Sequence, residues 1–148
     1  MPYPEELISP MRQDLVQLGI KELRTAAEVD DVLGSEQRTT MVVINSVCGC
    51  SAGGMRPAVA VSLTNEAKPD VLLSVFAGQD LDATERARGY FTGYPPSSPA
   101  VALMKDGELV YMMERHQIEG RHPLEIADTL KAVYDEHCSA GETADTVE

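Results

Sequence analysis

The sequence predicts an α/β fold built around a mixed sheet. Two continuous apolar runs, Thr40–Asn45 and Val71–Ala77, are typical of strands buried on both faces, and helix-like segments surround them. This alternation favours parallel strands joined by right-handed crossovers. Nearer the C-terminus, Ala100–Lys105 and Glu108–Glu114 flank Asp106-Gly107, a type I′ hairpin signal that adds antiparallel strands.

The first third of the chain predicts two helices and a short strand. Apolar residues recur at helical spacing in Glu6–Leu18, where Pro10 is placed to break the first part and the following glycine caps the end. Lys21–Leu23 is compatible with a strand. Thr25 is a good N-cap for the next helix, which stops at Gly34.

Three further helices follow. Ala52–Asn65 has helical spacing, and Pro57 either starts its regular part or kinks a helix that begins earlier. Asp82–Phe91 predicts a helix with a solvated charged face. Pro123–His137 has an apolar stripe and a proline near its start, as helices often do.

Length and composition favour one domain. A chain of 148 residues with 43% hydrophobic residues can bury a core without disulfide bonds. We expect residues 1–138 to form a single domain. The segment 139–148 is small, polar and acidic, which predicts a disordered tail.

The charge of the chain excludes several partners. Asp and Glu number 24 against 12 Lys and Arg, for a net charge of −12, which disfavours nucleic acids and anionic membrane surfaces. The N-terminus lacks a basic region followed by an apolar one, and no apolar run approaches membrane-spanning length. We therefore expect a cytoplasmic protein without membrane or nucleic-acid partners.

Two cysteines stand where a predicted strand meets a predicted helix, in the sequence Cys48-Gly49-Cys50. A helix N-terminus favours thiolate over thiol and can lower the pKa of a cysteine well below roughly 8.5. Cys48 lies nearer the loop and is the expected nucleophile. With three cysteines in all, a structural disulfide framework is not expected.

The Cys-x-Cys spacing predicts an asymmetric pair. Gly49 is expected to allow tight backbone geometry, yet a Cys48–Cys50 disulfide would close a small, strained ring. Strain raises the reduction potential, which favours chemistry through a mixed disulfide on one sulfur. Cys50 would then either resolve that intermediate or tune it. Arg56 either adds positive potential or is a solvated side chain.

Other roles for these residues remain open. The pair could bind zinc or copper together with Cys138 or a histidine, although a structural zinc site needs four ligands and only two are clustered. A domain that only binds partners is the third possibility. Cys138 is more simply an incidental thiol, and His116, His122 and His137 are expected at the surface.

The order of these elements resembles the thioredoxin-like fold, a three-layer α/β/α arrangement with a mixed central sheet. In that fold a proline opens the antiparallel hairpin beside the cysteines. The resemblance implies that the Ser98–Pro99 bond is cis and that the Ser98 backbone pairs with an extended substrate.

Several motifs also resemble the bacilliredoxins, thioredoxin-like proteins with a Cys-Gly-Cys motif. The similarity extends from about Pro4 to Cys138. The motifs are Ser46-Val47-Cys48-Gly49-Cys50, Arg56-Pro57, Val75–Asp80, Pro95–Pro99, Arg115–Gly120 and His137-Cys138.

This resemblance implies a thiol–disulfide oxidoreductase that removes bacillithiol from S-bacillithiolated proteins. Cys48 would take up the bacillithiol, and a second thiol or a partner reductase would regenerate it. Weak disulfide reductase or isomerase activity is the alternative. Bacillithiol is then a co-substrate, with no tightly bound cofactor and no metal. The candidate catalytic residues are Cys48 and Cys50, and the candidate substrate-binding residues are Gly49, Arg56, Ser98 and Pro99.

Overall fold

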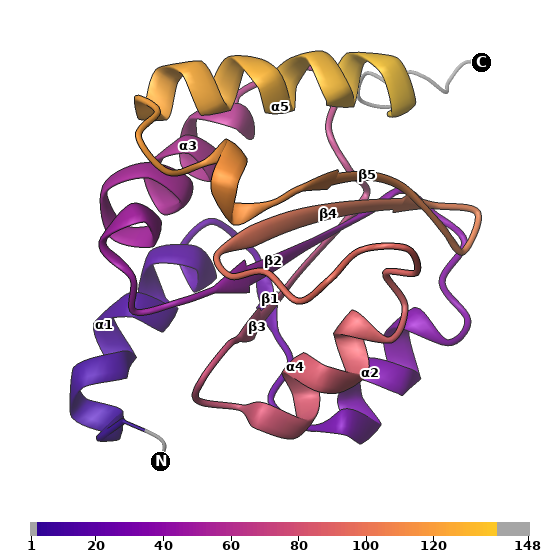
Figure 1. Cartoon of the computed structure of the whole chain (residues 1–148). Coiled ribbons are helices and arrows are strands. Elements are labelled where there is room, and N and C mark those ends of the chain that lie inside the picture. The colour runs from indigo at the N-terminus through magenta and orange to yellow at the C-terminus, as the bar shows by residue number, and fades with distance from the viewer. Residues whose placement is uncertain (1–2, 139–148) are drawn as a thin grey trace.

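The computed structural model describes residues 3–138, so the predicted tail at 139–148 lies outside the described residues. The chain forms five strands and the helices that surround them (Figure 1). In order, the elements are α1 (Glu5–Val16), β1 (Lys21–Glu22), α2 (Ala26–Leu33), β2 (Thr40–Asn45), the π-helical turn η1 (Ser51–Met55), α3 (Arg56–Ser62), β3 (Val71–Phe76), α4 (Leu81–Arg88), β4 (Ala100–Lys105), β5 (Glu108–Met113), the 3-10 turn η2 (Arg115–Gln117) and α5 (Pro123–His137).

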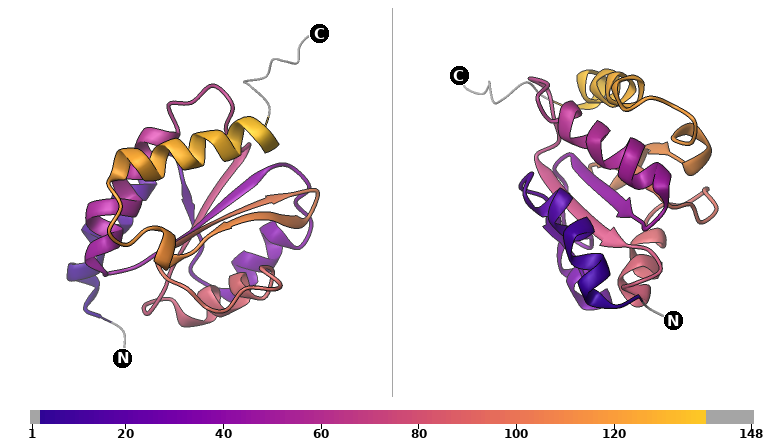
Figure 2. Two further views of the ribbon diagram at one scale, coloured as in Figure 1. Left: turned by 45° about the horizontal axis from the view of Figure 1, so that its top comes forward. Right: turned by 90° about the vertical axis from the view of Figure 1, so that its left-hand side faces the viewer.

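The strands form one mixed sheet in the order β1-β3-β2-β4-β5. β1 and β2 pair with β3 in parallel, whereas β4 is antiparallel to β2 and β5 is antiparallel to β4. Helices α3 and α5 cover one face and α2 and α4 the other (Figure 2). The predicted three-layer arrangement with a mixed sheet is confirmed.

Each face of the sheet has its own apolar core. One cluster joins the sheet to α3 and α5 through side chains such as Met41, Val59 and Leu130. The other joins it to α2 and α4 through Val29 and Ala83, among others. All six residues of β2 are buried, as its continuous apolar sequence predicts. The central strand that precedes the cysteines is therefore packed on both sides.

The hairpin between β4 and β5 has the predicted turn. Asp106 and Gly107 have φ values of 56° and 78°, and a type I′ turn requires positive φ at both central residues. The start of β4 lies beside the end of β2, since Ala100 pairs with Ile44. The residues just before β4 therefore reach the sheet edge where the cysteines follow β2.

Pro10 does not break α1, which is a correction to the sequence-based expectation. The helix continues through this residue from Glu5 to Val16. Proline removes one backbone hydrogen bond. That loss is offset by packing, because Ile8, Arg12 and Leu15 are all buried on the inner face of the helix.

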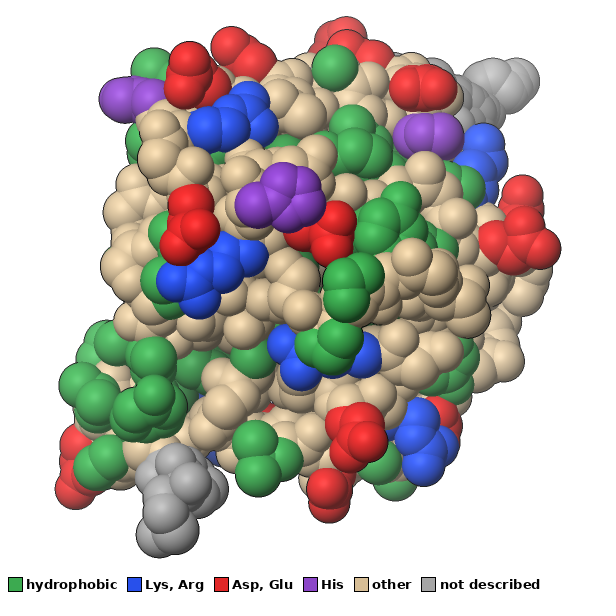
Figure 3. Space-filling view, viewed as in Figure 1, with side chains coloured by type: hydrophobic (Ala, Val, Ile, Leu, Met, Phe, Trp, Pro, Cys, Tyr) green, Lys and Arg blue, Asp and Glu red, His purple; other side chains and the backbone are tan. Residues whose placement is uncertain are grey.

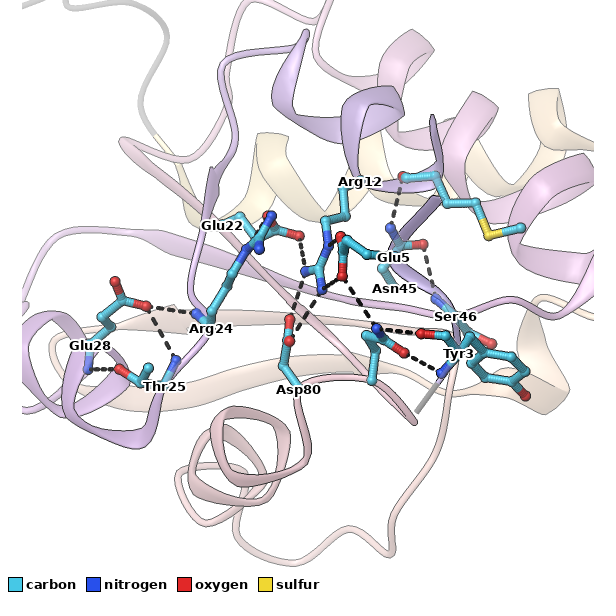
Figure 4. A network of polar contacts seen from close by, with 12 residues as sticks. Tyr3, Glu5, Arg12, Glu22, Arg24, Thr25, Glu28, Asn45, Ser46 and Asp80 are labelled. Atoms are coloured by element: carbon cyan, nitrogen blue, oxygen red, sulfur yellow. Dashed lines mark hydrogen bonds and ion pairs between the residues drawn. The ribbon is translucent and has the colours of Figure 1, made fainter. Parts of the chain in front are cut away.

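Arg12 ties α1 to the sheet through a cluster of carboxylates (Figure 4). Its side chain is only 3% exposed. The guanidinium lies 2.6 Å from both Glu22 Oε2 and Asp80 Oδ2 and 2.8 Å from Glu5 Oε2, over the ring of Phe76. These contacts join α1, β1 and the segment after β3.

No helix within residues 3–138 combines the length and apolar composition that crossing a membrane requires.

Candidate active site

Cys48 lies between the end of β2 and the start of a helical run, as the sequence predicts. That run covers Gly49–Ser62 and includes η1 and α3. The backbone N–H of Cys48 donates to Ser46 Oγ at 3.0 Å. Its carbonyl oxygen accepts from the N–H groups of Ser51 and Ala52 at 2.9 and 3.2 Å. Cys48 is thus fixed at the first turn of the helix.

The two thiols of the Cys-x-Cys motif are in contact. Cys48 Sγ lies 2.8 Å from Cys50 Sγ, and both cysteines are free and half-buried. The backbone N–H of Cys50 also points to Cys48 Sγ, at 3.4 Å. The Cys48 sulfur therefore has two contacts, one with the other thiol and one with the backbone.

These contacts separate the acidities of the two thiols. The pKa of Cys48 is lowered, first by the hydrogen bond from the Cys50 thiol and further by the Cys50 and Ser51 N–H groups and the positive charge of Arg115. Burial raises the pKa of Cys50 to about 11, and the neighbouring Cys48 sulfur adds to this effect. Cys48 is the thiol that ionises first.

Arg115 contacts the Cys48 thiol, and sequence reasoning did not select it as a site residue. Its Nη2 lies 3.2 Å from Cys48 Sγ, and its Nη1 lies 3.4 Å from the carbonyl oxygen of Ser98. Its backbone N–H donates to Ser97 Oγ at 2.7 Å. Glu119 Oε2 holds its Nε at 2.9 Å. One guanidinium therefore bridges the thiol and the loop before β4.

That loop carries the proline implied by the resemblance. The Ser98–Pro99 bond is cis. Arg88 Nη2 donates to the carbonyl oxygen of Ser97 at 3.3 Å, so arginines contact the loop from two sides. Pro99 is buried directly before β4. The structure thus brings Ser98 and Pro99 beside Cys48.

Asn45, the last residue of β2, is the centre of a buried polar network under the cysteines. Its Oδ1 accepts from the Ser46 N–H at 2.9 Å and from Ser51 Oγ and Arg56 Nη1 at 3.1 Å each. Its Nδ2 donates to the carbonyl oxygen of Met11 in α1, as Figure 4 shows. This network fixes both ends of the loop that carries Cys48.

Arg56 belongs to this network, so of the two roles left open for it the solvated side chain is wrong. Its side chain is 4% exposed and its Nε lies 3.4 Å from Asp14 Oδ2. Its hydrogen bonds go to Asn45 and to the Ser46 carbonyl oxygen, beneath the loop. Desolvation lowers its pKa. Arg115, and not Arg56, is the arginine that contacts the Cys48 thiol.

Gly49 is exposed, and because both cysteines are free, its expected role in the geometry of a Cys48–Cys50 disulfide stays a prediction. Its φ lies outside the left-handed region, and a Cβ built there meets no atom within 4 Å. The backbone between the two sulfurs therefore does not require glycine. The open space above it leaves the thiols accessible.

Cys138 lies at the opposite end of the sheet. Its thiol is half-buried beside Thr39 and Asp70, and burial raises its pKa. Thr39 precedes β2 whereas Cys48 follows it, a separation of roughly 20 Å along the strand. Because a disulfide needs Cα atoms within about 7 Å, Cys138 cannot pair with Cys48 in this fold.

The histidines lie at the surface, as expected. His116 and His122 are exposed and His137 is half-buried. Histidine side chains are visible on the face in Figure 3. Within residues 3–138 no group of three or more His, Cys, Asp or Glu side chains is placed to hold a metal ion.

Comparisons with known proteins identify similar chains. A family model described as disulphide isomerase matches residues 3–138. A bacilliredoxin from Koribacter versatilis is 49% identical over 138 residues, which cover 93% of this chain and 95% of that protein. A bacilliredoxin from Salinibacter ruber is 52% identical over 140 residues, covering 93% and 82%.

Solved structures support the fold. A thioredoxin variant from Halobacterium salinarum aligns with a TM-score of 0.54 at 18% identity, covering 80% of this chain and 90% of that one. Fasciola hepatica thioredoxin aligns with a TM-score of 0.52 at 18% identity, covering 80% and 99%. The fold is thioredoxin-like.

Proposed function

This chain belongs to the bacilliredoxin family, and from that premise we propose that it removes bacillithiol from S-bacillithiolated proteins through a mixed disulfide on Cys48. The chain is a thiol–disulfide oxidoreductase of thioredoxin-like fold. Its partners are then disulfide-bearing client proteins, and bacillithiol is a co-substrate.

The observation that carries this proposal is the unequal pair of thiols. Cys48 has the lowered pKa and receives hydrogen bonds through its sulfur, whereas the pKa of Cys50 is about 11. A thiolate is the attacking species in disulfide exchange. Only Cys48 is therefore ready to attack near neutral pH.

The first step is an exchange of one disulfide for another. The Cys48 thiolate attacks the bacillithiol sulfur of the mixed disulfide on the client. A bond forms between Cys48 Sγ and that sulfur, the bond to the client sulfur breaks, and the client thiolate leaves and takes up a proton. The exchange itself leaves the numbers of disulfides and of thiolates unchanged, and the proton that the released client thiolate then takes up comes from solvent. The Ser98 and Pro99 backbone borders the position where the client would lie.

Regeneration needs a second thiol. Once Cys48 is in a disulfide its charge no longer raises the pKa of Cys50, but burial, the largest cause, still does. Cys50 is consequently a slow internal nucleophile. We infer that free bacillithiol or a partner reductase attacks the adduct in competition with Cys50. Because Cys50 is slow, Cys48 is then the only cysteine of this pair that turnover requires.

Two other activities remain candidates for the same residues. The description of the matching family model favours disulfide reduction or isomerisation as a second activity. The other candidate is metal binding by the Cys48–Cys50 pair, which would need a further ligand from outside the residues that surround the thiols. A tightly bound, stoichiometric metal in purified reduced protein that is lost in Cys48→Ser would support the metal-binding alternative.

The carrier thiol is tested by comparing adducts on one client. A client protein with a single cysteine is prepared as its bacillithiol, glutathione or coenzyme A mixed disulfide. We expect release of the free client to be fastest from the bacillithiol adduct, with the released thiol recovered on Cys48 by mass spectrometry. Equal release from all three adducts, or faster turnover of a scrambled-disulfide protein, would contradict the proposed specificity.

A further inference from the structure

Arg115 has hydrogen-bonding capacity that its contacts in the free protein do not use. A guanidinium carries five N–H donors. Nε is held by Glu119, while Nη1 and Nη2 each have one contact, to Ser98 and Cys48. Within residues 3–138 no further acceptor is bound to either terminal nitrogen. The Nη1–Nη2 edge, which is the edge that binds carboxylates in pairs, is therefore partly free.

Formation of an adduct frees more of this edge. Nη2 lies 3.2 Å from the Cys48 sulfur, which carries a negative charge when it is a thiolate. When that sulfur joins a disulfide it becomes neutral, and the guanidinium loses its anionic partner there. The incoming sulfur stands about 2.05 Å from Cys48 Sγ. A carboxylate a few bonds beyond that sulfur is within reach of the Nη1–Nη2 edge, where Nη2 has lost the charge of its partner.

A negatively charged thiol that approaches Cys48 would meet the positive charge of Arg115 within an otherwise acidic protein. The whole chain has a net charge of −12, and acidic side chains are spread over the face in Figure 3. Arg115 is the arginine whose charge acts on both thiols, and its side chain is 46% exposed. Glu119, on its Nε side, opposes an incoming anion.

We propose that Arg115 binds a carboxylate of the small thiol while that thiol is attached to Cys48, so that the site favours anionic over neutral and cationic thiol carriers. This inference rests on the proposed function, because it concerns the adduct formed in its first step. It gives Arg115 a role in specificity beyond its contact with the thiolate.

Three symmetric disulfides of similar size test the inference: 3,3′-dithiodipropionate is anionic, 2-hydroxyethyl disulfide is neutral and cystamine is cationic. Each reacts with the Cys48 thiolate to give one adduct and one free small thiol. Initial rates of adduct formation are measured by intact-protein mass spectrometry in a Cys50→Ser background, with and without Arg115→Gln. For each probe, the rate of the protein that retains Arg115 is divided by the rate of the Arg115→Gln variant.

This ratio removes the intrinsic reactivity of each probe, and any change in thiolate fraction affects all three probes alike. We expect the ratio for the anionic probe to exceed that for the neutral probe roughly fivefold, with the cationic probe below both. Glu119→Gln should increase the preference for the anionic probe. Salt at 1 M should reduce it, because the screening length falls to about 3 Å.

The outcomes separate this inference from the function on which it rests. Equal ratios for the three probes would overturn the role of Arg115 and leave the attack by Cys48 intact. Adducts that do not map to Cys48 with any probe would overturn the proposed function itself. Arg115→Lys keeps the charge without the paired donors, so an anionic preference as strong as with arginine would overturn carboxylate binding by the Nη1–Nη2 edge.

Discussion

Replacing Cys48 by serine will reduce release of a small thiol from a client protein to the uncatalysed rate. A serine hydroxyl is not ionised near neutral pH, and burial, the largest cause, still raises the pKa of the remaining Cys50. Without an added thiol or reductase, Cys50→Ser will instead keep the first step and prolong the Cys48 adduct, because the internal nucleophile is gone. Free client is measured by thiol titration and the adduct by peptide mapping.

Cys138→Ser is the matched control for these variants. It removes a thiol of the same chain at the far end of β2, so activity should be unchanged. An adduct on Cys50 or Cys138 in the wild-type protein, or catalysis that survives Cys48→Ser, would contradict the assignment of the nucleophile.

Replacing Arg12 by leucine will produce the largest loss of stability. The substitution leaves Glu22 and Asp80, which are 12% and 13% exposed, without their cation. Removing one partner of a buried ion pair costs about 3 kcal/mol or more, which lowers the melting temperature by roughly 6–12 °C in a chain of this size. Thermal unfolding followed by circular dichroism measures the change.

Arg24→Ala is the control for charge alone, because Arg24 also pairs with Glu22 but is 52% exposed. Its melting temperature should stay close to that of the wild type. The hydrogen bond from Arg12 lowers the pKa of Glu5, so this part of the stability is present above the ordinary glutamate pKa and is lost as the pH falls through the lowered value. An Arg12→Leu protein that melts like the Arg24→Ala protein would contradict this role.

The fold could be predicted because its signals are local. The apolar run of β2 corresponds to a strand buried at every residue, and Asp106-Gly107 forms the expected turn. Thr25 caps α2 with Glu28 in a capping box. The position of the Cys48 thiol could be predicted from the same signals, because a strand ends before this residue and a helix begins after it.

Arg115 could not be predicted because a bulge decides its position. Counting back from the hairpin turn in strict register puts Glu114 opposite Pro99. The bulge between Leu103 and Met104 shifts the pairing by one residue, so that Val101 pairs with Met113 and not with Met112. A shift of one residue exchanges the two faces of a strand. The sequence contains no signal for this bulge, so it does not show which side chain after β5 reaches the Cys48 thiol.

The burial of Arg56 was not predicted for a different reason. Its burial depends on Asn45 and Asp14, which come from β2 and α1 and meet only in the folded chain. A sequence pattern cannot show such a tertiary partner for an isolated arginine.

The central claim is that the two neighbouring thiols differ in acidity, and pH-dependent alkylation mapped to each cysteine tests it most directly. Reduced wild-type protein is treated with iodoacetamide at low conversion from pH 5 to 11, and the modified peptides are quantified. We predict that Cys48 reacts with a midpoint below that of an ordinary cysteine, because its pKa is lowered, while Cys50 stays unreactive until about pH 11. Equal midpoints for the two cysteines, or modification of Cys50 first, would contradict the account.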